Sequence, residues 1–249
     1  MEFEHHDFLR QLAKHNIISS DPELGNYFNK AIRTAIIKLQ EDMSSAQVSY
    51  ALACSKKYSD EYLSNGVPNA SDMAILDEQM EFGYTRDLIE ESLSAIAEMR
   101  IVNFYKSYEI CIKSTIKQAY GKVDKNLFQW EGQKNFFNNL DIKIEEISGY
   151  LELNQLRTVN NCIKHQETFD EQVKKIKEFS KLDKITHDSC ELFYKRIEKP
   201  INDFVSVLSE KIYADRFEFN DERLNKLALE YKYRMNKNTF ALFIEKLKS

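Results

Sequence analysis

Apolar residues recur every three or four positions along most of this chain, and that spacing places them on one face of an α-helix. The first long run follows SSDPEL, whose Ser or Asp can cap a helix and whose Pro fits the first turn. We predict a helix of roughly forty residues there, ended by SNGVPN at positions 64–69. A second long helix is predicted over residues 85–120, where Gly121 stops it.

Shorter helices are predicted around these two. They cover residues 3–15, one or two pieces after Asn69, then 124–140, 149–168, 186–213 and 220–248. The segment DIKIEEISGY is interpreted as a connector with room for an extended piece, and the charged residues 169–184 as loop or frayed helix.

Glycine and proline are scarce, with 6 and 3 copies in 249 residues, and both normally punctuate turns and hairpins. The fold class predicted is therefore all-α, an up-and-down helical bundle with long antiparallel helices and extra helices at both termini. Three consecutive segments are expected: an N-terminal helical arm (1–68), a central bundle (69–182) and a C-terminal helical extension (183–249).

Charge and composition narrow the function classes. A net charge of −5 argues against a protein that coats nucleic acid by bulk electrostatics, so any RNA contact must be local. Residues 77–98 are rich in Asp and Glu, whereas 174–184 carry five lysines that form either a solvated face or an RNA track. No apolar run of about eighteen residues and no secretory start at MEFEHHDFLR occur, which predicts a cytoplasmic protein without a membrane contact.

The four cysteines are scattered and form no C-x-x-C pair, so reduced thiols are expected rather than disulfides or a zinc knuckle. His5 follows Glu2 by three positions, but no second motif of that kind appears, and no metal site is predicted. Phosphate loops, dinucleotide fingerprints and serine nucleophile elbows are also missing from the sequence, so no cofactor is expected.

The segment LNQLRTVNNCIKHQ, residues 153–166, combines an apolar and a polar face. On a helical wheel Leu151, Leu156, Val159, Cys162 and Ile163 share one side, and Asn154, Arg157, Thr158, Asn161 and His165 share the other. Asn and Thr lower helix stability at mid-helix positions and are tolerated where their hydrogen bonds serve structure or a ligand. The stripe is thus either a binding face or an ordinary solvated face.

A second unusual position is Glu109, which falls within the apolar stripe of FYKSYEICIKSTI. Either its carboxylate points at the core, where Arg157 or His165 would be its partner, or it lies at the edge of the core and reaches water.

These two segments together resemble the HEPN superfamily of helical-bundle proteins. The resemblance covers about residues 85–170 and is carried by Tyr105 and Glu109 in the first helix and by Arg157, Asn161, Lys164 and His165 in LRTVNNCIKH. It implies a commonly dimeric bundle, and many members are metal-independent endoribonucleases that act as toxins or in defence against phage. In the slot before Asn161, where the family most often has its arginine, this chain has Asn160.

On this resemblance, the catalytic residues would be Arg157, Asn161 and His165, supported by Glu109, Asn154, Asn160 and Lys164. Cleaving RNA without metal requires proton transfer and stabilisation of charge on the phosphate, which an imidazole and a guanidinium supply. The expected partners are RNA, with tRNA as one candidate, a second copy of the chain, and a cognate antitoxin or defence partner. Two alternatives stay open: a catalytically inactive HEPN-like module that binds RNA, nucleotide or a partner, and a helical scaffold protein.

Overall fold

The computed structural model describes residues 2–18, 26–121, 125–165 and 171–248, with the side chains of 2–6, 26–28 and 128 left out. Within these ranges the protein is all-α, as predicted, and no strand is present. The helices are α1 (Glu2–Ile18), α2 (Asn26–Ser55), α3 (Asp60–Asn65), α4 (Ala70–Tyr120), α5 (Trp130–Asn139), α6 (Tyr150–His165), α7 (Glu171–Lys174), α8 (His187–Phe217), α9 (Asp221–Arg234) and α10 (Lys237–Lys248). Short 3₁₀ turns, η1 (Lys125–Phe128) and η2 (Ile144–Glu146), complete the described structure.

Contacts divide the chain into two compact units, each built from separate segments. One contains residues 21–113 and 143–207, and the other contains residues 1–20, 114–142 and 208–249. The long helices α4 and α8 each contribute to both units, so this grouping differs from the three consecutive segments expected from sequence. That three-segment division stays a prediction.

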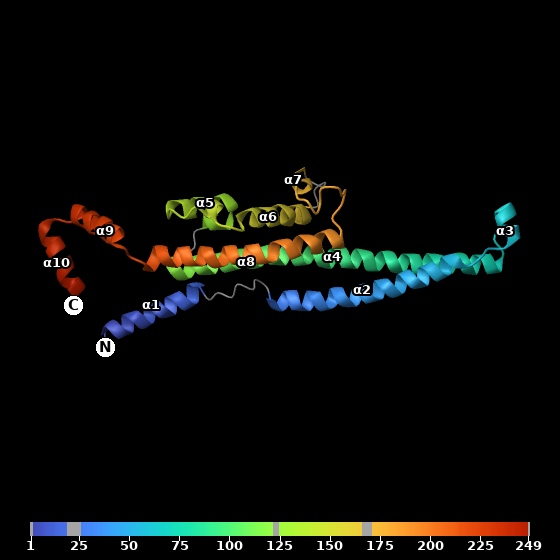
Figure 1. Cartoon of the computed structure of the whole chain (residues 1–249), viewed down its shortest axis with the longest axis horizontal. Helices are drawn as coiled ribbons and strands as arrows, with labels where there is room; N and C mark the ends of the chain where they lie inside the picture. The colour runs from blue at the N-terminus through green and yellow to red at the C-terminus, as the bar shows by residue number, and fades with distance from the viewer. Residues whose placement is uncertain (1, 19–25, 122–124, 166–170, 249) are drawn as a thin grey trace. The chain divides into compact units, whose positions relative to one another are not determined.

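The first unit is an up-and-down bundle of α2, α4, α6 and α8 (Figure 1). α2 and α4 run antiparallel and close a core of Ile32, Ile36 and Leu93, joined by Leu39, Met43, Ile89 and Ile96. Aromatic rings join α4 to α8, with centroid distances of 5.2 Å for Phe104–Tyr194 and 6.4 Å for Tyr108–Phe204. This arrangement confirms the predicted long antiparallel helices.

The second unit is held by aromatic and polar contacts around Tyr120 at the end of α4. Its ring lies 5.6 Å from that of Phe136 on α5, and its hydroxyl donates to Asp215 on α8 at 2.5 Å. Burial, followed by this hydrogen bond, raises the pKa of the Tyr120 hydroxyl.

Each of the two long predicted helices has one boundary that differs in the structure. α4 is a single helix from Ala70 because Gly83, in the middle of the run, packs against the ring of Tyr50 rather than ending it. α2 ends at Ser55, well before the predicted stop, because the chain after it turns to bond α4: Lys56 pairs with Glu78, and Gln79 donates to the carbonyl of Ala53 at 3.1 Å. These contacts are tertiary and leave no local sequence signal.

At the connector 141–150 the structure has the turn η2 and no strand, and Lys143 and Ile147 at the two ends of the turn have extended backbone. The predicted C-terminal helix is also two helices, α9 and α10, separated at Met235 and Asn236. Asn236 accepts a hydrogen bond from the backbone N–H of Thr239 at 2.9 Å, which caps α10 as a new helix.

Asp72 joins the loop after α2 to the start of α4. Its carboxylate accepts from the Ser59 backbone N–H at 2.7 Å, from the Ser59 hydroxyl at 2.6 Å and from the Asn69 N–H at 3.1 Å. Burial alone would raise the pKa of Asp72, but these hydrogen bonds outweigh it and the pKa is lowered. A lowered pKa means that the carboxylate contributes stability above its unfolded value and loses it as the pH falls through the folded value.

We therefore expect the Ser59–Asp72 connection to open on acidification below about pH 4, the ordinary value of an aspartate. Asp72→Asn should open it already at neutral pH, because an amide offers one acceptor oxygen to three donors. The backbone amide resonance of Ser59, followed by NMR against pH, reports the change. Glu61→Gln, which alters an exposed neighbouring acid, serves as the control, and an acid-insensitive Ser59 signal in the wild type would contradict the assignment.

Candidate functional site: the polar face of α6

Gly149 sets the position of α6 against α8. Its φ of +92° is left-handed, and a Cβ there would lie 2.2 Å from the carbonyl oxygen of Pro200, so only glycine fits. The backbone of the first turn of α6 thus packs directly on α8. This close approach determines which side of α6 faces the core.

The buried side of α6 is formed by Leu153, Leu156, Val159 and Asn160. Leu151, predicted on the apolar side, is 62% exposed, and Cys162 and Ile163 are only partly buried. Polarity alone places Leu151 on the buried side and Asn160 outside it. In the structure the packing of neighbouring helices sets a different rotation of α6, and Asn160 is buried. The predicted placement of Leu151 is therefore wrong.

Arg157 is held in place by Asn154, one turn earlier. The side-chain oxygen of Asn154 accepts from Nε and Nη2 of Arg157 at 3.3 and 3.1 Å, and its backbone carbonyl accepts from the hydroxyl of Thr158 at 3.0 Å. Because Arg157 is partly buried, these bonds restrict its planar guanidinium to few orientations. Such a group is prepared to bind an anion such as a phosphate.

Asn160 and Asn161 act as a pair. Asn160 is 1% exposed and donates through Nδ2 to the side-chain oxygen of the exposed Asn161 at 3.2 Å. This bond uses one lone pair of the Asn161 oxygen and turns the NH₂ group of Asn161 away from Asn160. The oxygen of Asn160 is buried without a hydrogen-bond partner among the described residues.

Lys164 and His165 are exposed at the C-terminal end of α6. His165 lies eight positions after Arg157, which separates the two by about 12 Å along the helix axis. That spacing favours a site in which the guanidinium and the imidazole come from two copies of the chain.

Glu109 lies at the edge of the core, where its carboxylate pairs with Lys113 Nζ at 3.7 Å and its side chain is 25% exposed. The first alternative, a carboxylate that points into the core, is therefore wrong. The neighbouring Tyr105 links α4 to α6 electrostatically: burial and the charge of Glu109 raise its pKa to about 12, and the charge of Arg157 opposes that rise. Tyr105, Glu109 and Arg157 thus share one neighbourhood.

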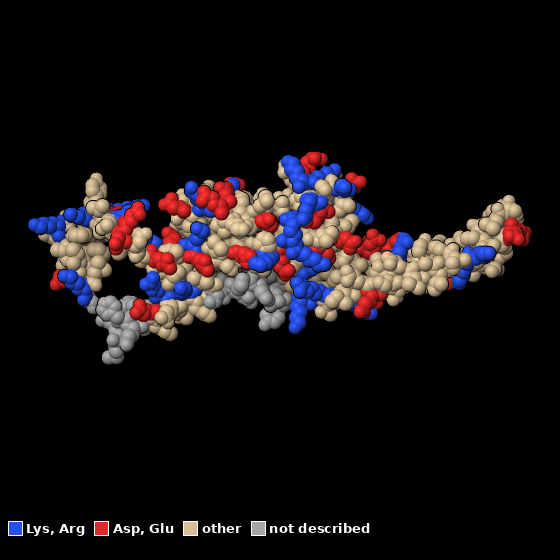
Figure 2. All heavy atoms as spheres, in the orientation of Figure 1, with Lys and Arg blue, Asp and Glu red and all other residues tan. Residues whose placement is uncertain are grey.

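Cations form a band over α7, α8 and α2, where Figure 2 shows Lys and Arg atoms gathered in the middle of the view. Ion pairs connect the band: Arg196 bonds Glu178 at 2.8 Å, and Arg33 lies 3.6 Å from Glu198. Four basic side chains of α2, α8 and the turn after α7 form ion pairs and are here called the basic band: Arg33, Lys177, Arg196 and Lys199. Lys177 and Lys199 are 74% and 83% exposed, and each lies beside an acid, Glu178 and Asp203.

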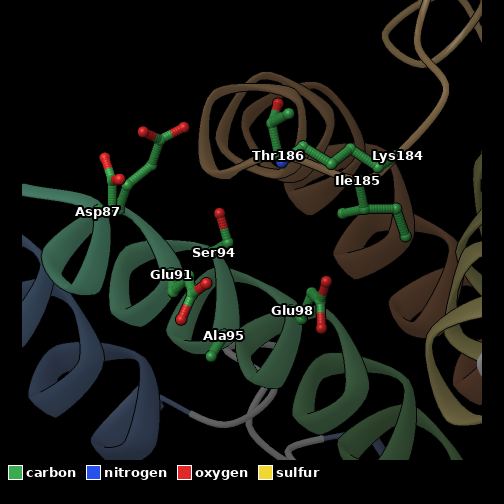
Figure 3. A pocket seen from close by; sticks show the side chains of 9 residues that line it. Asp87, Glu91, Ser94, Ala95, Glu98, Lys184, Ile185 and Thr186 are labelled. Carbon is green, nitrogen blue, oxygen red and sulfur yellow. The ribbon is translucent and has the colours of Figure 1, made fainter. Parts of the chain in front are cut away.

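A separate groove of about 520 Å³ lies between α4 and the start of α8 (Figure 3). One wall carries Asp87, Glu91 and Glu98, and Lys184 and Thr186 line the other. Burial raises the pKa of Glu98. The sequence showed the acidic run, but nothing local indicated that the residues before α8 lie across from it.

In the described part of the chain, no three His, Cys, Asp or Glu side chains lie close enough together to hold a metal ion. The side chains of His5 and His6 lie outside the described residues. The four cysteines are free thiols. No described helix is both long and apolar enough to span a bilayer.

Comparison with protein-family models, with curated proteins and with solved structures finds no match to this chain in any of the three. The structure defines the protein as an all-α helical bundle. The function proposed below is argued from the polar side chains of α6.

Proposed function

We propose that this chain is a metal-independent endoribonuclease of the HEPN type. The observation that carries the proposal is the polar face of α6, where Asn154 holds Arg157 and Asn160 orients Asn161, with Lys164 and His165 exposed beyond them. The Arg157, Asn161, Lys164 and His165 part of the HEPN-like motif lies on this same helix.

Each residue has a role in cleaving a phosphodiester bond. The imidazole of His165 takes the proton of a ribose 2′-hydroxyl, and the 2′-oxygen attacks the adjacent phosphorus. The bond from phosphorus to the 5′-oxygen breaks, that oxygen takes up a proton, and the products carry a 2′,3′-cyclic phosphate and a 5′-hydroxyl. Arg157 and the NH₂ group of Asn161 stabilise the charge that develops on the phosphate.

The separation of Arg157 from His165 requires two copies of the chain. If two α6 helices meet about a twofold axis, His165 of one copy lies beside Arg157 of the other, and two equivalent sites form. Lys164 and the basic band then contact the RNA backbone on either side. The substrate class is RNA, with tRNA as one candidate.

A toxin or anti-phage effector that works in the cytoplasm under the control of a cognate antitoxin or defence partner fits this activity. The support for this biological role is the family resemblance of the motif on α6.

Incubating the purified chain with total cellular RNA in the presence of a chelator tests the proposal. We expect cleavage by the wild type, and a loss of about 10²- to 10⁴-fold in rate for His165→Ala, the range of a general acid–base group. The cleavage rate of Arg157→Ala should fall by a similar factor, because the substitution removes the positive charge opposite the phosphate. Analysis of the product ends should show cyclic phosphates.

His15→Ala is the matched control, since His15 is exposed and belongs to the other unit. If the wild type cuts nothing, or if both α6 variants cut as fast as the control, the ribonuclease proposal is wrong.

A second candidate, a non-catalytic module that binds RNA, nucleotide or a partner, is favoured by Asn160. In the slot where the family most often has its arginine, this chain has a neutral side chain that is 1% exposed. Filter binding separates the two functions: RNA retention that depends on Arg157, without cleavage, would identify the binding module.

A further inference from the structure

The outer side of α4 carries an apolar stripe that no other described element covers. Met73, Met80, Tyr84 and Leu88 are 45%, 64%, 71% and 50% exposed, and intervals of seven, four and four place them on one face. Figure 2 shows the part of the chain formed by α2 and α4 as mostly uncharged atoms on the visible side. Exposed methionine and aromatic side chains in a row are typical of a docking surface.

Acidic residues border this stripe. Residues 72–98 contain eight acidic residues and one arginine, a net charge of −7, and Asp77, Glu81, Asp87 and Glu91 are exposed beside the apolar side chains. Two such stripes would repel each other, so the α4 faces of two copies do not pair directly. The occupant must be apolar and basic.

The C-terminal hairpin of α9 and α10 has this chemistry. Residues 221–248 contain seven basic and four acidic residues, a net charge of +3. Leu224 and Leu247 are 50% and 71% exposed, and in the described chain neither helix has a buried residue. The ring pair Tyr231–Phe243, 5.1 Å between centroids, holds the two helices together.

Helices of 14 and 12 residues are marginal in water unless an amphipathic face packs on something. The hairpin is attached to α8 through Arg223, which donates to the carbonyls of Ala214 and Glu218, and this attachment leaves its leucines uncovered. The apolar side chains of both surfaces are thus exposed in the described part of the chain, and the net charges of the two segments are opposite.

We propose that the α9–α10 hairpin of one copy docks on the Met80–Leu88 stripe of a second copy. Exchange about a twofold axis forms two identical contacts, in which lysines of the hairpin face Glu81 and Glu91 beside the buried apolar side chains. The proposal does not depend on RNA cleavage, and α6 has no residue in the contact.

Sedimentation velocity on the full chain tests the contact. We expect a dimer whose dissociation constant rises by about tenfold or more in Tyr84→Glu and in Leu247→Glu, since each places a charge in an apolar contact. Val48→Glu is the matched control, because Val48 is also exposed, at 61%, but lies on α2. Glu81→Lys with Glu91→Lys should weaken the dimer, and reversing Lys226 and Lys232 to Glu in the same chain should restore it.

Cysteine cross-linking identifies which copies touch. Chains with Tyr84→Cys are mixed with differently tagged chains with Leu247→Cys, both lacking the exposed Cys54, and a disulfide between the two chain types supports the proposal. The proposal is wrong if the chain is a monomer at all concentrations or if Tyr84→Glu leaves the dimer unchanged. It is also wrong if the disulfide forms only within one chain that carries both Tyr84→Cys and Leu247→Cys. A third result would also overturn the proposal and assign the hairpin to membranes. In it, the chain binds anionic vesicles, Leu247→Glu abolishes that binding, and Tyr84→Glu has no effect on self-association.

Discussion

A mixture of two inactive variants, Arg157→Ala and His165→Ala, is expected to regain about a quarter of the wild-type rate of RNA cleavage. The two residues lie on one helix about 12 Å apart along its axis, and in the site proposed above the arginine comes from one copy and the histidine from the other. When the variants mix randomly, half of the dimers contain both chain types, and each of these has one intact site of two.

The measurement is the initial rate of cleavage after the two variants are mixed and equilibrated. Each variant alone is the control and should stay inactive at the same total concentration. Mixed dimers that form and stay inactive would show that each site uses both residues from the same chain, and the composite site would then be wrong.

Arg100→Ala is expected to destabilise the bundle by about 3–5 kcal/mol, the usual effect of removing one partner of a buried ion pair. The Arg100 side chain is 4% exposed, its Nη1 lies 2.7 Å from Glu191 on α8, and its guanidinium carbon lies 3.6 Å from the ring centre of Tyr194. The substitution leaves the carboxylate of Glu191, 17% exposed, without this cation and removes the stacking on the ring.

Urea unfolding followed by circular dichroism measures this loss. Lys38→Ala is the matched control: it breaks an ion pair of 2.9 Å with Asp42 on an exposed face and should change stability by no more than about 0.5 kcal/mol. In the double variant with Glu191→Ala the total loss should be smaller than the sum of the single losses. A loss below about 1 kcal/mol for Arg100→Ala would contradict a structural role for the pair.

The Arg100 contacts also explain how α4 and α8 stay in register. Tyr194, on which Arg100 stacks, accepts from Asn29 of α2 at 2.9 Å and donates to Glu198 at 2.8 Å. Three helices that are distant in sequence thus meet at one buried polar group. α6 packs on the same helix α8, where Gly149 lies against Pro200.

Several features of the protein follow from its sequence alone. The all-α class, the long helices, the stop at Gly121 and the cap at Asn69 all arise from contacts between residues no more than four positions apart, which a single sequence displays directly. The sequence also indicated a polar side of α6, on which Asn161 and His165 are exposed and Arg157 is partly buried.

Other features were decided only by the tertiary structure. Leu151 is exposed and Asn160 buried because Gly149 brings α6 onto α8 at one rotation, which residues 50 positions away impose. The end of α2 at Ser55 and the Lys113 partner of Glu109 depend in the same way on what packs around them. Burial and the pairing of side chains depend on which helices lie next to each other, whereas helix formation depends on the local chain. The sequence therefore predicted the helices but not which side chains are buried or paired.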